Sequence, residues 1–367
     1  MKPVKKALVF GDAMIPETLF RPPFDEYLSR YVQDTVFANW EEDWPTLQNR
    51  RLEVEKKGPE IETVPEAVLE HGKDAEMIMG LFVPVSKKVM DEMPDLRLAG
   101  VCRAGLENVN VAEATGRGIL VFNVLGRNAE AVSDFAIGMM IAESRNIARA
   151  HHAIKGGTWR KTFPNSDFVP QLKRKTVGII GFGFIGRLVA KKLSGFDVKV
   201  LVYDPYTDSE TVKKSGCLPV DKKTLFSESD FVTIHARLTE ENSNLAGEEE
   251  FGLMKKSAYL INTGRAGLVD EKALVKALKE ERIAGAALDV FPVEPVPPYS
   301  ELLQLDNVTL TTHIAGTTTE ALTQSPGLLM EDIEKLLKGK ECSFIVNPEV
   351  LNDSRFSKWL EKVRQPS

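Results

Sequence analysis

Six short apolar runs between residues 176 and 312, separated by polar or helix-forming segments, constrain the fold of this 367-residue chain more than any other feature. Runs of this length and composition are typical of buried strands. Strands that alternate with helices predict a parallel sheet covered by helices on both faces, so we expect a doubly wound α/β domain here. The six runs are TVGII, VKVLVY, DFVTIH, AYLIN, GAALDVF and NVTLTT.

The first 123 residues predict a second, smaller α/β unit. Residues 40–65 within it are polar and contain three prolines, so we expect a surface excursion there. The short apolar runs that predict its strands lie at residues 4–10, 77–82, 98–102 and 119–123.

Three further segments have a predicted conformation. Residues 129–147 carry apolar side chains at helical spacing and predict one long helix, whereas residues 156–170 hold two prolines and two glycines and predict a loop. Near the C-terminus we expect an amphipathic helix that packs on the body of the protein or on a second subunit. Its apolar positions are Phe356, Trp359, Leu360 and Val363.

The composition excludes several classes of protein. A chain with 43% hydrophobic and 27% charged residues is ordinary for a folded protein, and its net charge of −6 gives no reason to expect nucleic-acid or membrane-surface binding. No stretch approaches 18 consecutive apolar residues, so we expect no membrane span. Cys102, Cys217 and Cys342 are too widely spaced for a metal motif or a disulfide framework. We therefore expect no metal, and a reducing, cytoplasmic location.

A glycine-rich motif follows the first of the six runs directly. Gly181, Gly183 and Gly186 form a Gly-x-Gly-x-x-Gly pattern between a predicted strand and a predicted helix, the context in which this motif binds a dinucleotide. The first glycine permits the turn, the second lets the backbone approach a pyrophosphate, and the third allows close packing of helix on strand.

An acidic residue at the end of the next strand indicates which dinucleotide binds. Asp204 lies 23 residues after Gly181, close to the spacing at which an acid meets the adenosine ribose. Its carboxylate can accept hydrogen bonds from both ribose hydroxyls and would repel a 2′-phosphate. The sequence therefore predicts NAD rather than NADP as the cofactor.

Polar side chains gather where the six predicted strands end. In a parallel sheet all these ends meet at one edge, where ligands bind. Arg265, Glu294 and His313 lie there and supply an anion clamp, a carboxylate and a proton donor, the groups that hydride transfer to a carbonyl needs.

These motifs resemble the D-isomer-specific 2-hydroxyacid dehydrogenase family, whose members include phosphoglycerate, glycerate and D-lactate dehydrogenases. The resemblance covers about residues 94–347. It implies an oxidoreductase that transfers a hydride between NAD and a D-2-hydroxy acid or its 2-oxo acid. The most specific segments are VGIIGFGFIGRLVAKKL, LINTGRAGLVDEKALVKALKEERIAGAALDVFPVEP and TTHIAG.

The resemblance also implies a role for individual residues. Arg265 would bind the substrate carboxylate, His313 would be the general acid–base, and Glu294 its acidic partner. Asp289 would lie near the nicotinamide amide. The substrate-domain loop would hold the carboxylate through the backbone amides of Arg103, Ala104 and Gly105. The expected cofactor contacts are Gly181, Gly183, Phe184, Ile185, Gly186, Asp204, His235, Thr263 and Asp289.

The family fold implies two Rossmann-like domains, with the NAD domain inserted into a discontinuous, flavodoxin-like substrate domain. We place the NAD domain at residues 124–316 and the substrate domain at 1–123 and 317–367, with the active site in the cleft between them. Members of the family are usually homodimers, and we expect the helix at 129–147 to contribute to the interface.

Two departures from the family pattern bear on specificity. The loop at residues 102–110 is two residues shorter than the common form, and Arg237 stands where proline is usual. Arg103 and Arg127 flank the predicted cleft and would suit a second anionic group, as in a sugar acid or a phosphorylated hydroxy acid such as 3-phosphoglycerate. Alternatively, each arginine pairs with a nearby acid, Glu107 or Glu130.

Other functions remain open at this point. The chain could be a glyoxylate or hydroxypyruvate reductase, or an NAD-sensing binding protein similar to the C-terminal-binding-protein corepressors. Formate dehydrogenases carry glutamine at the acid position, so Glu294 argues against them.

Overall fold

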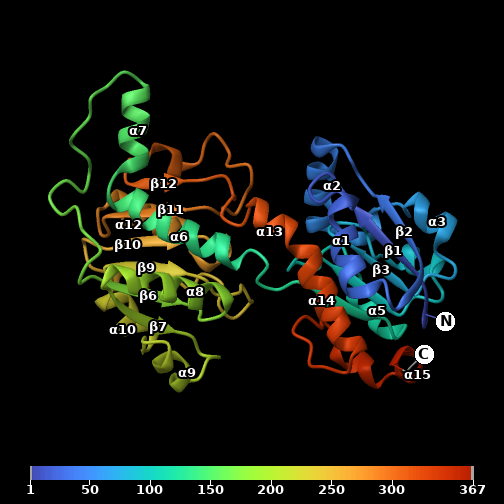
Figure 1. The fold of residues 1–367 in the computed structure, drawn as a ribbon. Coiled ribbons are helices and arrows are strands. Elements are labelled where there is room, and N and C mark those ends of the chain that lie inside the picture. Colours follow the sequence, from blue (N-terminus) through green and yellow to red (C-terminus); the bar gives the residue numbers. More distant parts are fainter. Residues whose placement is uncertain (1, 365–367) are drawn as a thin grey trace. The chain divides into compact units, whose positions relative to one another are not determined.

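The computed structural model describes residues 2–364, which divide into two compact units. Unit 1 combines the chain up to Arg127 with the chain from Thr318 onward, and unit 2 is the continuous segment from Asn128 to Thr317. No helix among the described residues is long and apolar enough to cross a membrane. Both units are α/β, as the alternation of apolar and helical segments predicted (Figure 1).

Unit 1 is built on a five-stranded parallel sheet with the order β2-β1-β3-β4-β5, which is the flavodoxin-like order. Successive residues of β1 point to opposite faces of the sheet, so Ala7 and Val9 pack in one core and Leu8 and Phe10 in another. The strands are β1 (Val4–Gly11), β2 (Val32–Asn39), β3 (Met77–Gly80), β4 (Leu98–Val101) and β5 (Leu120–Asn123).

Several helices flank this sheet. The C-terminal helix α15 (Ser354–Arg364) buries all four apolar residues predicted for it, in the core that α14 (Ser325–Leu337) also lines. The expectation that it packs on the body of the protein is therefore confirmed. The remaining helices are α1 (Arg21–Pro23), α2 (Trp44–Lys57), α3 (Glu66–His71), α4 (Lys87–Glu92), α5 (Val111–Gly116) and α13 (Thr319–Thr323).

The predicted surface excursion at residues 40–65 is largely helical. Asp43 caps α2 by accepting a hydrogen bond from the Thr46 amide, and Pro45 stands in the first turn, where its missing N–H costs nothing. Leu47 and Val54 are buried, so the helix is attached to the unit through its apolar face. The segment lies mostly at the surface, as predicted, and the helix within it was not predicted, because a proline can stand in the first turn of a helix as well as in a loop.

Unit 2 contains a seven-stranded parallel sheet with the order β12-β11-β10-β9-β6-β7-β8. All six predicted strands are present, and the two-residue β8 adds an edge. The first six strands in chain order have the doubly wound arrangement of dinucleotide-binding domains. The strands are β6 (Thr176–Ile180), β7 (Lys199–Tyr203), β8 (Leu218–Pro219), β9 (Phe231–Ile234), β10 (Tyr259–Asn262), β11 (Gly285–Leu288) and β12 (Val308–Leu310).

Helices cover both faces of the second sheet (Figure 1). On one face lie α6 (Ala129–Ser144) and α8 (Phe184–Leu193), and on the other lie α10 (Lys222–Glu228), α11 (Glu248–Leu253) and α12 (Glu271–Lys279). The remaining helices are α7 (Ile147–Lys155) and α9 (Ser209–Lys214).

The long helix expected at residues 129–147 is interrupted. It ends at Ser144, and Asn146 adopts a left-handed conformation with φ 58° before α7 begins. Periodicity alone did not indicate this break, because asparagine tolerates the left-handed region without a glycine signal.

Candidate active site

The glycine-rich loop joins β6 to α8 in unit 2. Gly181 has φ +88°, and a Cβ there would lie 2.6 Å from the backbone nitrogen of Ala236. A Cβ on Gly186 would lie 2.1 Å from the Gly181 carbonyl oxygen, so the helix packs directly on the turn. A Cβ on Gly183 would meet nothing within 4 Å. The loop is therefore tight where it packs and open where a ligand would approach.

The first turn of α8 carries backbone amides that the protein does not cap. The N-cap residue is Gly183, which has no side chain to accept from them. The first amides of a helix have no partner within it, and the helix dipole makes this end positive. The amides of Phe184, Ile185 and Gly186 can therefore receive a pyrophosphate.

Asp204 follows β7 and ties its end to the glycine loop. One carboxylate oxygen, Oδ2, accepts from the Phe182 amide at 2.6 Å, and Oδ1 accepts from Tyr206 and Thr207 at 2.8 and 3.2 Å. A carboxylate has about four acceptor positions, so about one remains on Oδ2 for a ribose hydroxyl. The sequence analysis expected bonds to both hydroxyls. The negative charge that opposes a 2′-phosphate is in place.

Two buried polar atoms lie at the ends of neighbouring strands β9 and β10. The Nδ1 atom of His235 and the Oγ1 atom of Thr263 have no hydrogen-bond partner among the described residues. The Nε2 atom of His235 shares a hydrogen bond of 2.9 Å with the Thr233 hydroxyl. Burial lowers the pKa of His235 to about 3, so its ring is neutral at physiological pH. Unpartnered buried polar atoms are rare, and these two fit a dinucleotide that would supply their partners.

Glu294 and His313 form a direct pair. Oε2 of Glu294 lies 2.8 Å from Nδ1 of His313, and Oε1 accepts from the Phe291 amide at 3.0 Å. The two residues follow β11 and β12, which are neighbours in the sheet. The Nε2 atom of His313 makes no hydrogen bond within residues 2–364, and the side chain is 46% exposed. One ring nitrogen is therefore oriented by a carboxylate while the other is available to a substrate.

Arg265 follows β10, the strand next to β11. Asn262 holds its loop by donating to the Arg265 carbonyl at 3.0 Å and accepting from the Gly264 amide at 3.0 Å. Within the described chain the exposed guanidinium forms no ion pair, and its one hydrogen bond is to the Gly264 carbonyl at 2.9 Å. The charge is therefore available for a carboxylate, at the sheet edge that also carries Glu294 and His313.

Asp289 lies in surroundings that the resemblance did not imply. It is fully buried, and its carboxylate accepts hydrogen bonds from Thr311, Ile314 and Ala315. These three residues belong to the segment that carries His313. The interaction expected with the nicotinamide amide would have to use the small acceptor capacity that remains.

In unit 1, Arg103 lies in the loop after β4, and its side chain is held by neighbouring residues. Its Nη2 atom lies 3.3 Å from Glu55 and 3.1 Å from Glu107, and its guanidinium stacks 4.7 Å from the Phe82 ring centre. Two acids therefore balance the charge of Arg103. The amides of Ala104 and Gly105 donate to no protein group within residues 2–364, which leaves them free for a ligand.

Arg127 differs from Arg103 in its partners. Its Nη1 atom donates to the Ala321 carbonyl at 3.2 Å, and no carboxylate of the described chain forms an ion pair with it. Glu130, the acid considered as its partner, pairs with Lys192 at 2.7 Å instead. Burial lowers the pKa of Arg127, and a guanidinium stays protonated in proteins.

The sequence analysis missed Asp12. This residue follows β1, at the edge of the unit 1 sheet where the Arg103 loop also follows its strand. Its Oδ1 accepts from the Met14 and Ile15 amides at 2.8 and 3.0 Å, whereas Oδ2 is buried without a partner among the described residues. Burial raises the pKa of Asp12 to about 6, against the lowering effects of these amides and of the Arg127 charge. The signal in the sequence is an acidic residue just after the apolar run at residues 4–10, the same kind of signal that identified polar residues at the strand ends of the second sheet.

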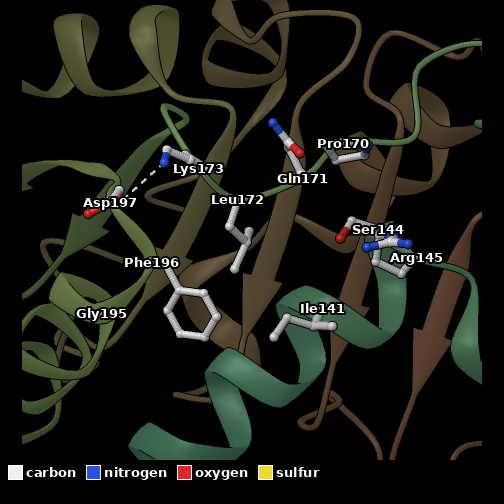
Figure 2. Close-up of a pocket in the computed structure, with 10 residues that line it drawn as sticks. All are labelled: Ile141, Ser144, Arg145, Pro170, Gln171, Leu172, Lys173, Gly195, Phe196 and Asp197. Atoms are coloured by element: carbon white, nitrogen blue, oxygen red, sulfur yellow. Dashed lines mark ion pairs between the residues drawn. The ribbon is translucent and has the colours of Figure 1, made fainter.

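A surface cavity of about 380 Å³ lies elsewhere in unit 2, between the end of α6 and the loop that precedes β6. Figure 2 shows Ile141, Leu172 and Phe196 facing a common space, with the Lys173–Asp197 ion pair of 3.5 Å at one side. None of the predicted catalytic or cofactor residues lines it, so it is not the site described above.

Comparisons with known proteins identify the family of the chain. The family model described as D-isomer specific 2-hydroxyacid dehydrogenase, NAD binding domain, matches residues 137–315. A glyoxylate reductase of Thermofilum pendens is 43% identical over 291 residues, which are 78% of this chain and 85% of that protein. The chain belongs to the D-isomer-specific 2-hydroxyacid dehydrogenase family. It is accordingly an NAD-dependent oxidoreductase.

Other relatives differ in length and in name. A D-3-phosphoglycerate dehydrogenase of Methanocaldococcus jannaschii is 38% identical over 77% of this chain but only 53% of its own length. The apo structure of D-lactate dehydrogenase from Escherichia coli superposes with a TM-score of 0.67 at 26% identity, covering 93% of this chain and 99% of that one. These family members carry different substrate names, so the family alone does not identify the substrate.

Proposed function

We propose that this dehydrogenase interconverts a D-2-hydroxy acid and its 2-oxo acid through Arg265, Glu294 and His313. The observation that carries the proposal is the 2.8 Å Glu294–His313 pair on β11 and β12, beside the unpaired guanidinium on β10. Arg265 binds the carboxylate of the substrate, where two parallel N–H bonds also fix its orientation. In reduction, Nε2 of His313 donates a proton to the forming alkoxide, and in oxidation it accepts the hydroxyl proton. Glu294 orients the ring and stabilises its charged form.

The NAD site, on this proposal, consists of the glycine loop, the first turn of α8, Asp204, His235 and Thr263. Bound NAD supplies the chemistry of hydride transfer, and the protein orients it and excludes competing reactions. Unit 2 is then the cofactor domain and unit 1 the substrate domain, whose free Ala104 and Gly105 amides help to hold the substrate carboxylate. The free thiols of Cys102, Cys217 and Cys342 are consistent with the proposed cytoplasmic location.

The direct test is reduction of a panel of 2-oxo acids by NADH, followed by loss of absorbance at the nicotinamide band. The parent protein should turn over at least one of them. His313→Ala should lower kcat by about 10²- to 10⁴-fold while NADH still binds, because a general acid–base group is lost. A binding protein of the corepressor kind would bind NADH without turnover, and that result would overturn the proposal.

The tail of the substrate is the finer question, and we propose that it carries an anionic group that Arg127 binds. Of the two arginines considered, Arg103 is balanced by Glu55 and Glu107, whereas Arg127 has only a carbonyl partner. An unpaired, largely desolvated guanidinium favours a carboxylate or phosphate. Glyoxylate, the substrate in the printed names of several relatives, has no such tail.

Arg127→Ala should therefore raise the KM for 3-phosphohydroxypyruvate far more than the KM for glyoxylate. Arg97→Ala is the matched control, because Arg97 also donates only to carbonyls but precedes β4, at the opposite edge of the same sheet. Equal effects of Arg127→Ala on both substrates would show that Arg127 is structural and would favour a glyoxylate reductase.

We also propose a homodimer, with an interface other than the one first expected. Most apolar side chains of α6 are buried within unit 2, and Phe135 and Ile141 are partly buried, so this helix offers little free apolar surface. In contrast, α7 buries none of its residues, and Ile147, Ile154 and the nearby Trp159 are 53%, 53% and 75% exposed. Apolar side chains gathered in this way favour contact with a second copy.

A further inference from the structure

The most constrained part of the candidate site is the segment around His313. Asp289, which directly follows β11, is fully buried and accepts three hydrogen bonds from this segment. Its Oδ1 accepts from the Thr311 hydroxyl at 2.6 Å and the Ile314 amide at 3.0 Å, and its Oδ2 accepts from the Ala315 amide at 2.9 Å. The donors lie two residues before His313 and one and two residues after it, so one carboxylate holds both sides of the histidine.

The backbone at His313 needs such support. Its φ of 56° lies in the left-handed region, which residues other than glycine adopt uncommonly. A conformation of this kind persists where the surrounding structure determines it. Two successive amides that converge on one carboxylate fix the turn immediately after His313, and the Thr311 bond fixes the approach to it. This left-handed conformation sets the direction in which the imidazole projects from the backbone.

The position of the imidazole is what the proposed chemistry depends on. Nδ1 of His313 reaches Oε2 of Glu294 at 2.8 Å, and Glu294 is itself held by the Phe291 amide. Both ends of the pair are thus anchored from the ends of β11 and β12. The three bonds to Asp289 leave about one acceptor position on Oδ2, the same number as at Asp204, so the carboxylate can hold the His313 segment and still accept from a nicotinamide amide.

We propose that Asp289 is a positioning residue that holds the His313 segment in its left-handed turn, with Thr311 as its side-chain partner. The inference rests on the proposed function, because it assigns to Asp289 the task of orienting the acid–base group. It is additional to the cofactor contact that the family resemblance implied.

The first experiment uses Asp289→Asn, which keeps the size of the side chain but places an NH₂ group where backbone N–H groups must be accepted. Reduction of the best 2-oxo acid should lose about 100-fold in kcat, the order of loss expected when a catalytic group is displaced by about 1 Å. The KM for the oxo acid should stay within about threefold, because the proposed substrate contacts are made by other residues. The Kd for NADH, measured by fluorescence, should change by less than about tenfold, because most of the proposed cofactor contacts lie elsewhere in unit 2. Asp306→Asn, an exposed acid before β12, is the control and should leave all three values unchanged.

A second variant keeps the test decisive if Asp289→Asn does not fold. Thr311→Val removes only one of the three donors, so it should lower kcat by a smaller factor, about tenfold. Thr311→Ser restores the hydroxyl and should recover most of the rate. A structural role of Thr311 in general stability would not produce this selective loss and recovery of kcat.

A double-mutant cycle separates this inference from the proposed function. If Asp289 acts only through His313, then Asp289→Asn should not lower the residual rate of His313→Gln any further. Independent, multiplicative losses would overturn the inference while leaving the role of His313 intact, and so would a Kd for NADH raised tenfold or more with kcat retained. If His313→Gln keeps the parent rate, the proposed function fails first and the inference with it.

Discussion

Asp12 and Asp204 both follow a strand of a parallel sheet, yet their carboxylates meet different surroundings. Asp204 is half-buried and accepts from three backbone amides. Asp12 accepts from two, and its other oxygen is buried without a partner among the described residues. Both aspartates therefore hold the loop after a strand, but only Asp12 also keeps a buried carboxylate oxygen without a partner.

The buried charge of Asp12 should appear in the pH dependence of stability. Burial raises its pKa from 3.8 to about 6, so the folded protein holds this proton more tightly than the unfolded chain does. Between these two pH values the folded state binds more protons, and its stability therefore falls as the pH rises. A shift of about two units corresponds to about 3 kcal/mol at neutral pH.

Asp12→Asn should therefore stabilise the protein at pH 7 by up to about 3 kcal/mol, and much less at about pH 4. Its amide oxygen can still accept from Met14 and Ile15. Urea unfolding at several pH values measures the difference, with exposed Asp25→Asn as the control. A destabilised Asp12→Asn at pH 7 would mean that the favourable partners of the charge, the backbone amides and Arg127, outweigh the effect of burial.

The charge of Asp204 should decide between the two dinucleotides. Asp204→Ser removes the negative charge that opposes a 2′-phosphate and also removes acceptors for the Phe182 and Tyr206 amides. We expect the ratio of kcat/KM for NADH to that for NADPH to fall by about tenfold or more, since a charge-assisted contact is exchanged for a neutral one. The measurement compares both cofactors at one concentration of oxo acid. A parent enzyme that prefers NADPH would contradict this role of Asp204.

At the scale of elements, neighbouring strands bring the residues of the site together. Arg265, Glu294 and His313 come from the ends of β10, β11 and β12, which are far apart in the chain but adjacent in the sheet. The helix α2 has a comparable effect in unit 1, because it brings Glu55 to Arg103 and so neutralises a charge that the sequence left available.

The exposed helix α7 carries a prediction about assembly. If its apolar side chains contact a second copy, then the double variant Ile154→Glu and Trp159→Glu should dissociate the dimer, because each places a charge in an apolar interface. Light scattering after size exclusion should give the mass of two chains for the parent and of one chain for the variant. Leu69→Glu, on an exposed part of α3, should remain dimeric. A parent that is monomeric at micromolar concentration would refute the interface.

At the scale of the whole molecule, each unit has its own hydrophobic cores. The buried residues of unit 1 fall in two clusters on the faces of its sheet, and those of unit 2 fall in two others. Units with separate cores can unfold separately. All of the proposed NAD contacts belong to unit 2.

Scanning calorimetry should therefore resolve two unfolding transitions. NADH should raise the midpoint temperature of only one of them, the unfolding of unit 2. At a concentration about 100 times its Kd, a ligand stabilises the state that it binds by about 2.7 kcal/mol. A truncated protein is not required, because a chemical label on the buried thiol of Cys102 in unit 1 or Cys217 in unit 2 assigns each transition by its exposure during heating. If NADH raises the midpoint temperatures of both transitions equally, the two units unfold as one.

Much of the fold and the membership of the candidate catalytic set were predictable because their signals are local. A buried parallel strand is a continuous apolar run, and a dinucleotide loop needs three glycines at fixed spacing, so both are visible without a structure. The strand β2 was missed because it is an edge strand in which Val32 alone is fully buried. Arg265, Glu294 and His313 were recognised by motif, and the structure places Glu294 against His313.

Tertiary structure decided the interactions between segments that are distant in the chain. Glu55 lies 48 residues from Arg103, and Thr311 lies 22 residues from Asp289, so no local pattern relates them. The sequence determined which residues stand at the ends of the strands. Only the fold determined whether a neighbour neutralises each charge, as at Arg103, or leaves it available, as at Arg127. The reason is that burial and charge balance are set by all the segments that pack together, whereas strands and glycine turns depend on the few residues that form them.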